Sequence, residues 1–179
     1  GTRVDYQIVA TDDDGNVTAF PPDEENPLSF DVIALTGEPV IYVVMSGSSV
    51  LSALDSGNGR EVARISTGDT PHAAVMTPDQ ETIFVANTGF GGQKSRTVSA
   101  ISTSTHATLA TINVGFGPLD LVMSPAGDRV FVTNSDSRSL SVIDVGALRE
   151  VTRINLSAMA DGPFGIAISP DGKTVYATD

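Results

Sequence analysis

The sequence predicts an all-β protein built from a repeated unit of four short antiparallel strands. A turn motif recurs at spacings of 47 and 45 residues, each copy preceded by a proline and followed by an apolar run. Proline and glycine interrupt the chain at short intervals, and the apolar residues show no 3.6-residue periodicity. Short strands repeating at this period are typical of the four-stranded blades of a β-propeller.

Three sets of landmarks keep the same period, which indicates true structural repetition. The turn motifs are Thr77-Pro78-Asp79-Gln80, Ser124-Pro125-Ala126-Gly127 and Ser169-Pro170-Asp171-Gly172; the upstream prolines are Pro71, Pro118 and Pro163; the apolar runs begin at Ile83, Val130 and Val175. An earlier run, residues 41–44, fits the same slot. Within each blade we expect four strands, named a to d in chain order. One blade has b at 130–134, c at 140–144 and d at 150–156, and strand a of the next blade follows at 164–169.

Residues 37–179 therefore supply strands b, c and d, two full sets of four, and then a and b, or about three blades. Closed propellers have four to eight blades, so the repeats form a partial propeller. We expect either that the native chain continues past Asp179 or that copies self-associate through open blade faces. Residues 28–34 are an alternative strand a of the first blade, or else belong to a preceding domain.

Residues 1–36 differ from the repeats. Val4, Tyr6 and Ile8 alternate with polar residues as in a half-buried strand, and the proline- and acid-rich residues 21–27 predict a linker. The pattern Tyr-x-Ile-x-Ala-x-Asp-x-x-Gly-Asn, followed by Ser-Phe-x-Val, resembles the last strands of immunoglobulin-like modules in bacterial and archaeal surface proteins. We therefore expect residues 1–36 to be the end of such a domain.

A second resemblance covers residues 38–179. The runs Phe131-Val132-Thr133-Asn134, Leu140-Ser141-Val142-Ile143-Asp144 and Ser169-Pro170-Asp171-Gly172 resemble the YVTN-type β-propeller repeat. Other copies depart from it at Ala86, Gln80 and Ala126, changes that are conservative for a turn. The resemblance implies similarity to archaeal surface-layer proteins and to bacterial secreted or periplasmic repeat proteins. It also implies similarity to lactonase-like propellers and to the haem d1-binding domain of nitrite reductases.

Composition excludes several classes of function. The net charge is -12, with no basic stripe, which argues against nucleic acid as a partner. No apolar run is long enough for a membrane-spanning helix, so we expect no membrane insertion. Cysteine is absent and there are two histidines, so nitrogen and sulfur ligands cannot build a three-ligand zinc site. We expect no metal and no cofactor.

Two residues could carry chemistry at the propeller axis. His72 lies at the start of one of the a strands, where it could act as a base or metal ligand at the channel mouth. Alternatively, the position accepts any bulky side chain, as its counterparts Leu119 and Phe164 suggest. Asp120 has small counterparts in the other blades. It is a candidate catalytic acid, or else a carboxylate bonded to backbone amides.

Other candidates lie at turns. Residues 89–96 predict a flexible, locally basic insertion between strands b and c, with Phe90, Lys94 and Arg96 as a partner-contact site. His106 is predicted to be exposed in a c–d turn. The acceptor sequons Asn16-Val17-Thr18 and Asn155-Leu156-Ser157 are glycosylation candidates.

These features predict an extracellular, cell-surface or periplasmic β-propeller scaffold or binding module. Its partner would be another protein, a ligand or further parts of the same polypeptide. One alternative is an enzyme or cofactor-binding propeller, lactonase-like or haem d1-domain-like, with its site at the axial channel. Another is a structural subunit of a surface layer or filament. The enzyme requires several polar residues converging on the axis, and the sequence offers His72 and Asp120.

Overall fold

The computed structural model describes residues 8–11, 17–20, 40–90, 93–158 and 162–179 and divides the chain into two compact units, 1–32 and 33–179. In the first unit, β1 (Ile8–Thr11) pairs antiparallel with β2 (Val17–Phe20). The immunoglobulin-like assignment and the domain boundary after residue 36 stay predictions. The proposed strand at 28–34 lies outside the described residues.

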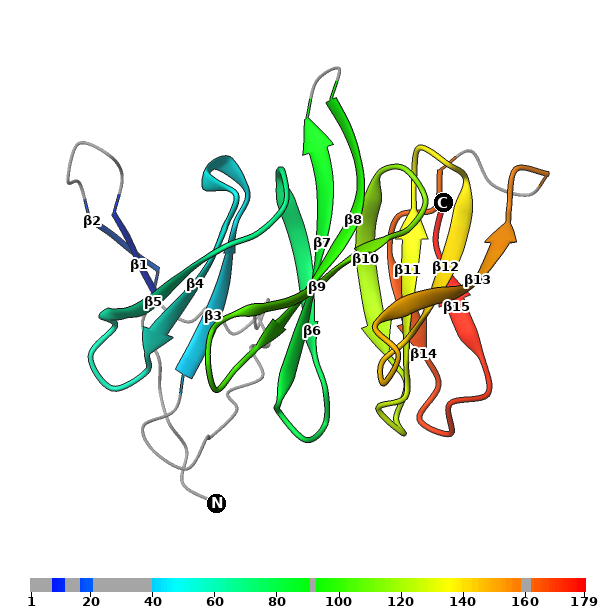
Figure 1. Cartoon of the computed structure of the whole chain (residues 1–179). Coiled ribbons are helices and arrows are strands. Elements are labelled where there is room, and N and C mark those ends of the chain that lie inside the picture. The colour runs from blue at the N-terminus through cyan, green and yellow to red at the C-terminus, as the bar shows by residue number, and fades with distance from the viewer. Residues whose placement is uncertain (1–7, 12–16, 21–39, 91–92, 159–161) are drawn as a thin grey trace. The chain divides into compact units, whose positions relative to one another are not determined.

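The second unit is a row of antiparallel sheets that follow one another along the chain (Figure 1). Blade 1 comprises β3 (Val40–Met45), β4 (Val50–Asp55) and β5 (Glu61–Ser66), with a short 3-10 turn at Ser46–Ser48. Blade 2 comprises β6 (Pro71–Met76), β7 (Thr82–Phe90), β8 (Gln93–Ser102) and β9 (Thr108–Asn113). Blade 3 comprises β10 (Pro118–Met123), β11 (Arg129–Asn134), β12 (Ser139–Asp144) and β13 (Arg149–Asn155). Blade 4 comprises β14 (Ile166–Ile168) and β15 (Val175–Ala177).

This strand order confirms the predicted fold class. The described part of the second unit is all-β apart from one 3-10 turn, and its sheets contain three, four, four and two strands. The strands match the predicted b, c, d, then two sets of a to d, then a and b. The second unit is a partial β-propeller.

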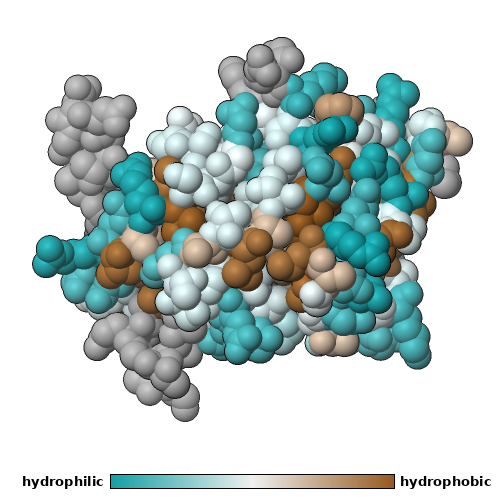
Figure 2. All heavy atoms as spheres, in the orientation of Figure 1, coloured by the Kyte–Doolittle hydropathy of each residue, from teal (hydrophilic) through white to brown (hydrophobic). Residues whose placement is uncertain are grey.

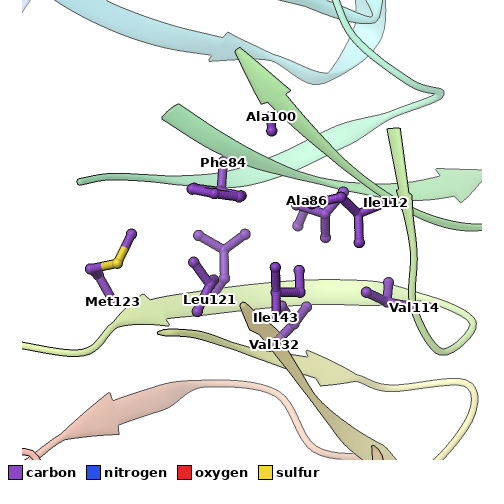
Figure 3. Close-up of a cluster of buried hydrophobic side chains, with 11 residues drawn as sticks. Phe84, Ala86, Ala100, Ile112, Val114, Leu121, Met123, Val132 and Ile143 are labelled. Carbon is purple, nitrogen blue, oxygen red and sulfur yellow. The ribbon is translucent and has the colours of Figure 1, made fainter. Parts of the chain in front are cut away.

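The core lies between consecutive blades, because both faces of blade 2 are buried. Along β7, Phe84 and Ala86 face blade 3 and join the larger cluster shown in Figure 3, whereas Ile83 and Val85 face blade 1. Successive side chains of a strand point to opposite faces. A strand that is covered on both sides must therefore be apolar at nearly every position, and this explains the uninterrupted apolar run that begins at Ile83.

The turn motif between strands a and b is held by a hydroxyl-to-carboxylate hydrogen bond. Ser169 Oγ donates to Asp171 Oδ1 at 2.6 Å, and Thr77 bonds Asp79 in the same way. Where Ala126 replaces the aspartate, Ser124 Oγ donates instead to Asp128 Oδ1 at 2.8 Å. The turn is thus kept in all three copies, as expected for conservative departures.

These turns make stability depend on pH. The Thr77 hydroxyl, followed by the Glu81 backbone amide, holds the pKa of Asp79 below its ordinary value of 3.8. Ser169, followed by the Lys173 amide, lowers the pKa of Asp171 likewise. A lowered folded-state pKa stabilises the fold above the unfolded-state pKa, and this contribution is lost as pH falls through the folded-state pKa.

We therefore predict that an Asp79→Ala/Asp171→Ala variant is less stable than the parent chain at neutral pH. The difference should shrink as pH falls below about 4, where carboxylates become protonated. Urea unfolding midpoints of both proteins, measured from pH 7 down to pH 3, check this. A difference that stays constant or widens in acid would contradict it.

Candidate functional site at the inner strands

The inner strands β6, β10 and β14 carry the predicted axial residues, and hydrogen bonds tie the start of each one to the preceding blade. The donors are hydroxyls in strand b of a blade (β3, β7 or β11) or just after it, and the acceptors are backbone carbonyls. The pairs are Ser46 Oγ to Pro71 O at 2.5 Å, Thr88 Oγ1 to Pro118 O at 2.7 Å and Thr133 Oγ1 to Phe164 O at 2.8 Å. The inner strands of neighbouring blades also contact one another.

His72 is exposed, and its imidazole is part of this set of ties. Its Nδ1 lies 3.1 Å from the carbonyl oxygen of Leu119 on the next inner strand. A carbonyl only accepts, so Nδ1 is the donor, and in the neutral ring Nε2 keeps an acceptor lone pair. His72 therefore links β6 to β10 while leaving one ring nitrogen able to accept a proton.

Asp120 is half-buried, and both of its carboxylate oxygens accept from backbone amides. Oδ1 accepts from Leu121 N at 2.8 Å, and Oδ2 accepts from Ile166 N of blade 4 at 3.1 Å. The Thr133 hydroxyl accepts from the amide of Asp120 at 3.1 Å. Asp120 and Thr133 together hold the first residues of the blade 4 inner strand.

The structure does not join these two residues into one reactive group. In the part of the chain that the structure describes, no hydrogen bond or ion pair connects the His72 imidazole with the Asp120 carboxylate. Over the same residues, no group of three His, Cys, Asp or Glu side chains is close enough to hold a metal ion. The inner-strand site offers one imidazole lone pair and a carboxylate that is already hydrogen-bonded.

A half-open cavity of about 310 Å³ lies elsewhere, against blade 4. Its lining is mostly apolar and comprises Leu140, Leu156, Pro163, Val175, Ala177, Thr178 and Asp179. Neither His72 nor Asp120 lines it. It therefore adds no chemistry to the inner-strand site.

The described residues 89–90 and 93–96 of the predicted loop extend strands β7 and β8, so the prediction of a loop at these residues was wrong. Gly89 pairs with Lys94, and the backbone of Phe90 pairs with Gln93, after a register shift beyond Asn87. Backbone pairing continues because β7 and β8 lengthen together to Phe90 and from Gln93; the side chain of Phe90 lies outside the described residues.

The two basic residues of this hairpin already contact blade 3 and the connection that leads to it. Lys94 Nζ lies 3.2 Å from Asp136 Oδ1, and the Arg96 guanidinium lies 5.7 Å from the centre of the Phe116 ring. Arg96 O also accepts from Val114 N at 2.8 Å. A partner site at Phe90, Lys94 and Arg96 stays a prediction, and any partner would compete with these contacts.

His106 also differs from its prediction. It is half-buried in the turn between β8 and β9, where its Nε2 lies 3.3 Å from the hydroxyl of Tyr42 in blade 1. The two rings meet edge to face with centroids 6.2 Å apart, and burial raises the pKa of Tyr42. His106 was predicted to be exposed, but its ring packs against Tyr42 of the neighbouring blade, while the adjacent turn residues Thr105 and Ala107 are exposed.

The two glycosylation candidates have different outcomes. Asn155 is exposed at the end of β13, and its Oδ1 accepts from Ser157 N at 2.8 Å. Its sequon is accessible, and modification stays a prediction. Asn16 lies outside the described residues.

Sequence reasoning missed the buried asparagines at the ends of the apolar runs. Asn87 is fully buried and bonds Gly68 N, Thr97 Oγ1 and Ser99 Oγ. Asn134 occupies the equivalent place and donates to Ser141 Oγ at 2.8 Å. The available signal was a polar residue that ends each apolar run at the same repeat position.

The strand order, the buried blade faces and the ties between inner strands define a β-propeller. A family model described as lactonase, 7-bladed beta-propeller matches residues 47–179. This match covers well over half of the chain, and the chain belongs to that family. In the described residues, no helix is long and apolar enough to cross a membrane.

A solved structure shares the fold. Hydrazine synthase from Kuenenia stuttgartiensis matches with a TM-score of 0.70 and 26% sequence identity, over 77% of this chain and 38% of that one. The chain thus spans well under half the length of the hydrazine synthase chain. No curated protein matches.

Proposed function

We propose that the chain is a non-enzymatic β-propeller scaffold or binding module of an extracellular, cell-surface or periplasmic protein. The observation that carries the proposal is the bonding of Asp120. Both oxygens of its carboxylate accept from backbone amides, one of them in the next blade. These two bonds fix the carboxylate between blades 3 and 4, which is a structural role.

The location and the partner class are supported by the sequence. The YVTN-type repeat resemblance and the immunoglobulin-like pattern of residues 1–36 both favour a surface or secreted protein. The exposed sequon at Asn155 agrees with this location. The partner would be another protein, a ligand or further parts of the same polypeptide.

A lactone-hydrolysing enzyme is the second candidate. The family model favours it, and His72 is exposed with one ring nitrogen that can accept a proton. In that case His72 would be a general base for attack of water on the lactone carbonyl. Asp120 would then orient backbone groups and would not contact the substrate.

Lactone hydrolysis and stability together separate the two functions. The scaffold predicts that the purified chain hydrolyses δ-gluconolactone no faster than buffer does. It also predicts that Asp120→Ala lowers the free energy of unfolding by about 1–3 kcal/mol, because the part-buried amides of Leu121 and Ile166 lose their acceptor. Asp69→Ala is the matched control, since Asp69 is exposed and its carboxylate accepts from the neighbouring Thr70 hydroxyl, with no bond to another blade among the described residues.

The enzyme predicts the opposite result. Turnover well above buffer that His72→Ala abolishes, with the melting temperature unchanged, would reject the scaffold. The His72 variant is informative because the residue is exposed, and substitutions of exposed residues usually change stability by less than about 0.5 kcal/mol.

A further inference from the structure

The outermost strand of each complete or nearly complete blade has a β-bulge that carries an exposed apolar residue. In β5, β9 and β13 the pairing register shifts by one residue, which leaves Val62, Leu109 and Val151 without a partner on the neighbouring strand. Their exposed fractions are 53%, 50% and 39%. The three residues occupy one repeat position, and we call them the rim row. Figure 2 shows apolar atoms on the face of the second unit that carries these strands.

Charged residues flank the rim row in a repeated pattern. Residues 60–65 read Arg-Glu-Val-Ala-Arg-Ile and residues 149–154 read Arg-Glu-Val-Thr-Arg-Ile, whereas the equivalent segment of blade 2, residues 107–112, is uncharged. These two patterns contain four arginines and two glutamates, a net charge of +2 on a chain whose net charge is -12. The segments of blades 1 and 3 thus each carry a net charge of +1, with Asp144, which binds Arg129, opposite Arg149 on the neighbouring strand, and the segment of blade 2 is uncharged.

The bulges determine which of these arginines form ion pairs with a glutamate. The extra residue brings the glutamate and the second arginine to one side of the strand, so Arg64 lies 3.6 Å from Glu61, and Arg153 binds Glu150 through two nitrogens at 2.8 and 2.9 Å. The first arginine of each pattern, Arg60 or Arg149, forms no ion pair with any residue in the described part of the chain. These two cations are available to a partner.

The same bulges determine how a partner can bind. A bulge and charged side chains on an edge strand disfavour the addition of another strand. A partner must therefore meet side chains and not extend the sheet. At physiological salt the Debye length is about 8 Å, so a bound partner responds mainly to the rim's own charges and not to the acids elsewhere in the chain.

We propose that the rim row binds an acidic protein segment, with carboxylates against Arg60 and Arg149 and an apolar side chain against Leu109. The inference rests on the proposed function as a binding module and assigns it a surface and a partner chemistry. Charge complementarity selects an acidic partner over a basic one, and the apolar centre selects a polypeptide over a small anion.

A short fluorescein-labelled peptide in which two glutamates precede each leucine tests the inference by fluorescence anisotropy. The test uses the full chain. We expect Arg60→Glu/Arg149→Glu to weaken binding at least about tenfold and Leu109→Ser about fivefold, from lost ion pairs and lost apolar contact. Lys173→Glu, which changes the net charge as much as Arg60→Glu alone, and Tyr176→Ser, at a similarly exposed aromatic residue, should change binding less than about twofold.

Three results would overturn the inference: no binding of the peptide, equal binding of a peptide with lysine in place of glutamate, or equal effects of the rim and control variants. Circular dichroism of each variant is the control for correct folding. If the peptide binds but the rim variants have no effect, the rim row is not the binding surface, and the proposed function as a binding module is retained. Turnover of δ-gluconolactone that depends on His72 would reject the proposed function instead, so the two failures are distinguishable.

Discussion

Replacement of Phe84 by alanine is expected to lower the free energy of unfolding by about 3–5 kcal/mol. Phe84 is fully buried and has the largest side chain among the residues with no exposed surface. It lies in the core shared by blades 2 and 3, across from Leu121 and Met123 (Figure 3). Removal of the ring leaves a cavity at the interface of two blades, because neither sheet can collapse into it without breaking its own pairing.

Urea unfolding followed by far-ultraviolet circular dichroism measures this loss. Phe164→Ala is the matched control, since Phe164 is 60% exposed, and it should shift stability by less than about 0.5 kcal/mol. Should the alanine variant not fold, Phe84→Leu gives a smaller loss that can be measured. A Phe84→Ala loss below about 1 kcal/mol would contradict the packing described.

Replacement of Gly68 by alanine is expected to cost about 1–3 kcal/mol, the usual range for overpacking a buried site. A β-carbon at Gly68 would lie 2.6 Å from Cγ and Nδ2 of Asn87. The Asn87 amide cannot move aside cheaply, because it donates to Thr97 and Ser99 and accepts from Gly68 N. Either the amide gives up these bonds or the d–a connection shifts away from the sheet.

Gly47→Ala is the control for this prediction, since a β-carbon there meets no atom within 4 Å. Thermal unfolding of the two alanine variants should separate them clearly, with the Gly47 variant close to the parent chain. Equal melting temperatures would show that the contact between Gly68 and Asn87 is looser than described.

Much of the fold was predictable from the sequence because each blade repeats the same physical requirements. Apolar runs such as the one at Ile83 mark strands covered on both faces, and the motif at Ser169 supplies a hydroxyl and a carboxylate to one turn. These signals are local, so they can be recognised in the sequence without knowledge of the three-dimensional neighbours. The predicted strand order was therefore confirmed through blade 4.

The site was less predictable because its contacts join residues far apart in the chain. The partner of the Asp120 carboxylate is Ile166 N, 46 residues away, and that of the His106 ring is Tyr42, 64 residues away. Lys94 was predicted as part of a free loop, but Asp136 of the next blade holds it. No local pattern encodes which residues of two blades will meet.

The rim row was only partly predictable from the sequence. Its signal, the repeated Arg-Glu-Val-x-Arg-Ile pattern, is present in the sequence. Strict alternation along a strand, however, would have placed Glu61 and Arg64 on opposite faces. The bulge at Val62 is what brings them together, and it becomes visible with the pairing register.

The central claim is that Asp120 ties blades 3 and 4 together through its carboxylate. Amide hydrogen exchange in the parent chain and in Asp120→Ala tests it most directly. We expect exchange at Ile166 and Leu121 to accelerate at least about tenfold in the variant, as the loss of about 1.4 kcal/mol of local stability requires. Exchange at Val85, in the core between blades 1 and 2, should change much less. Unchanged exchange at Ile166 in the variant would contradict the claim.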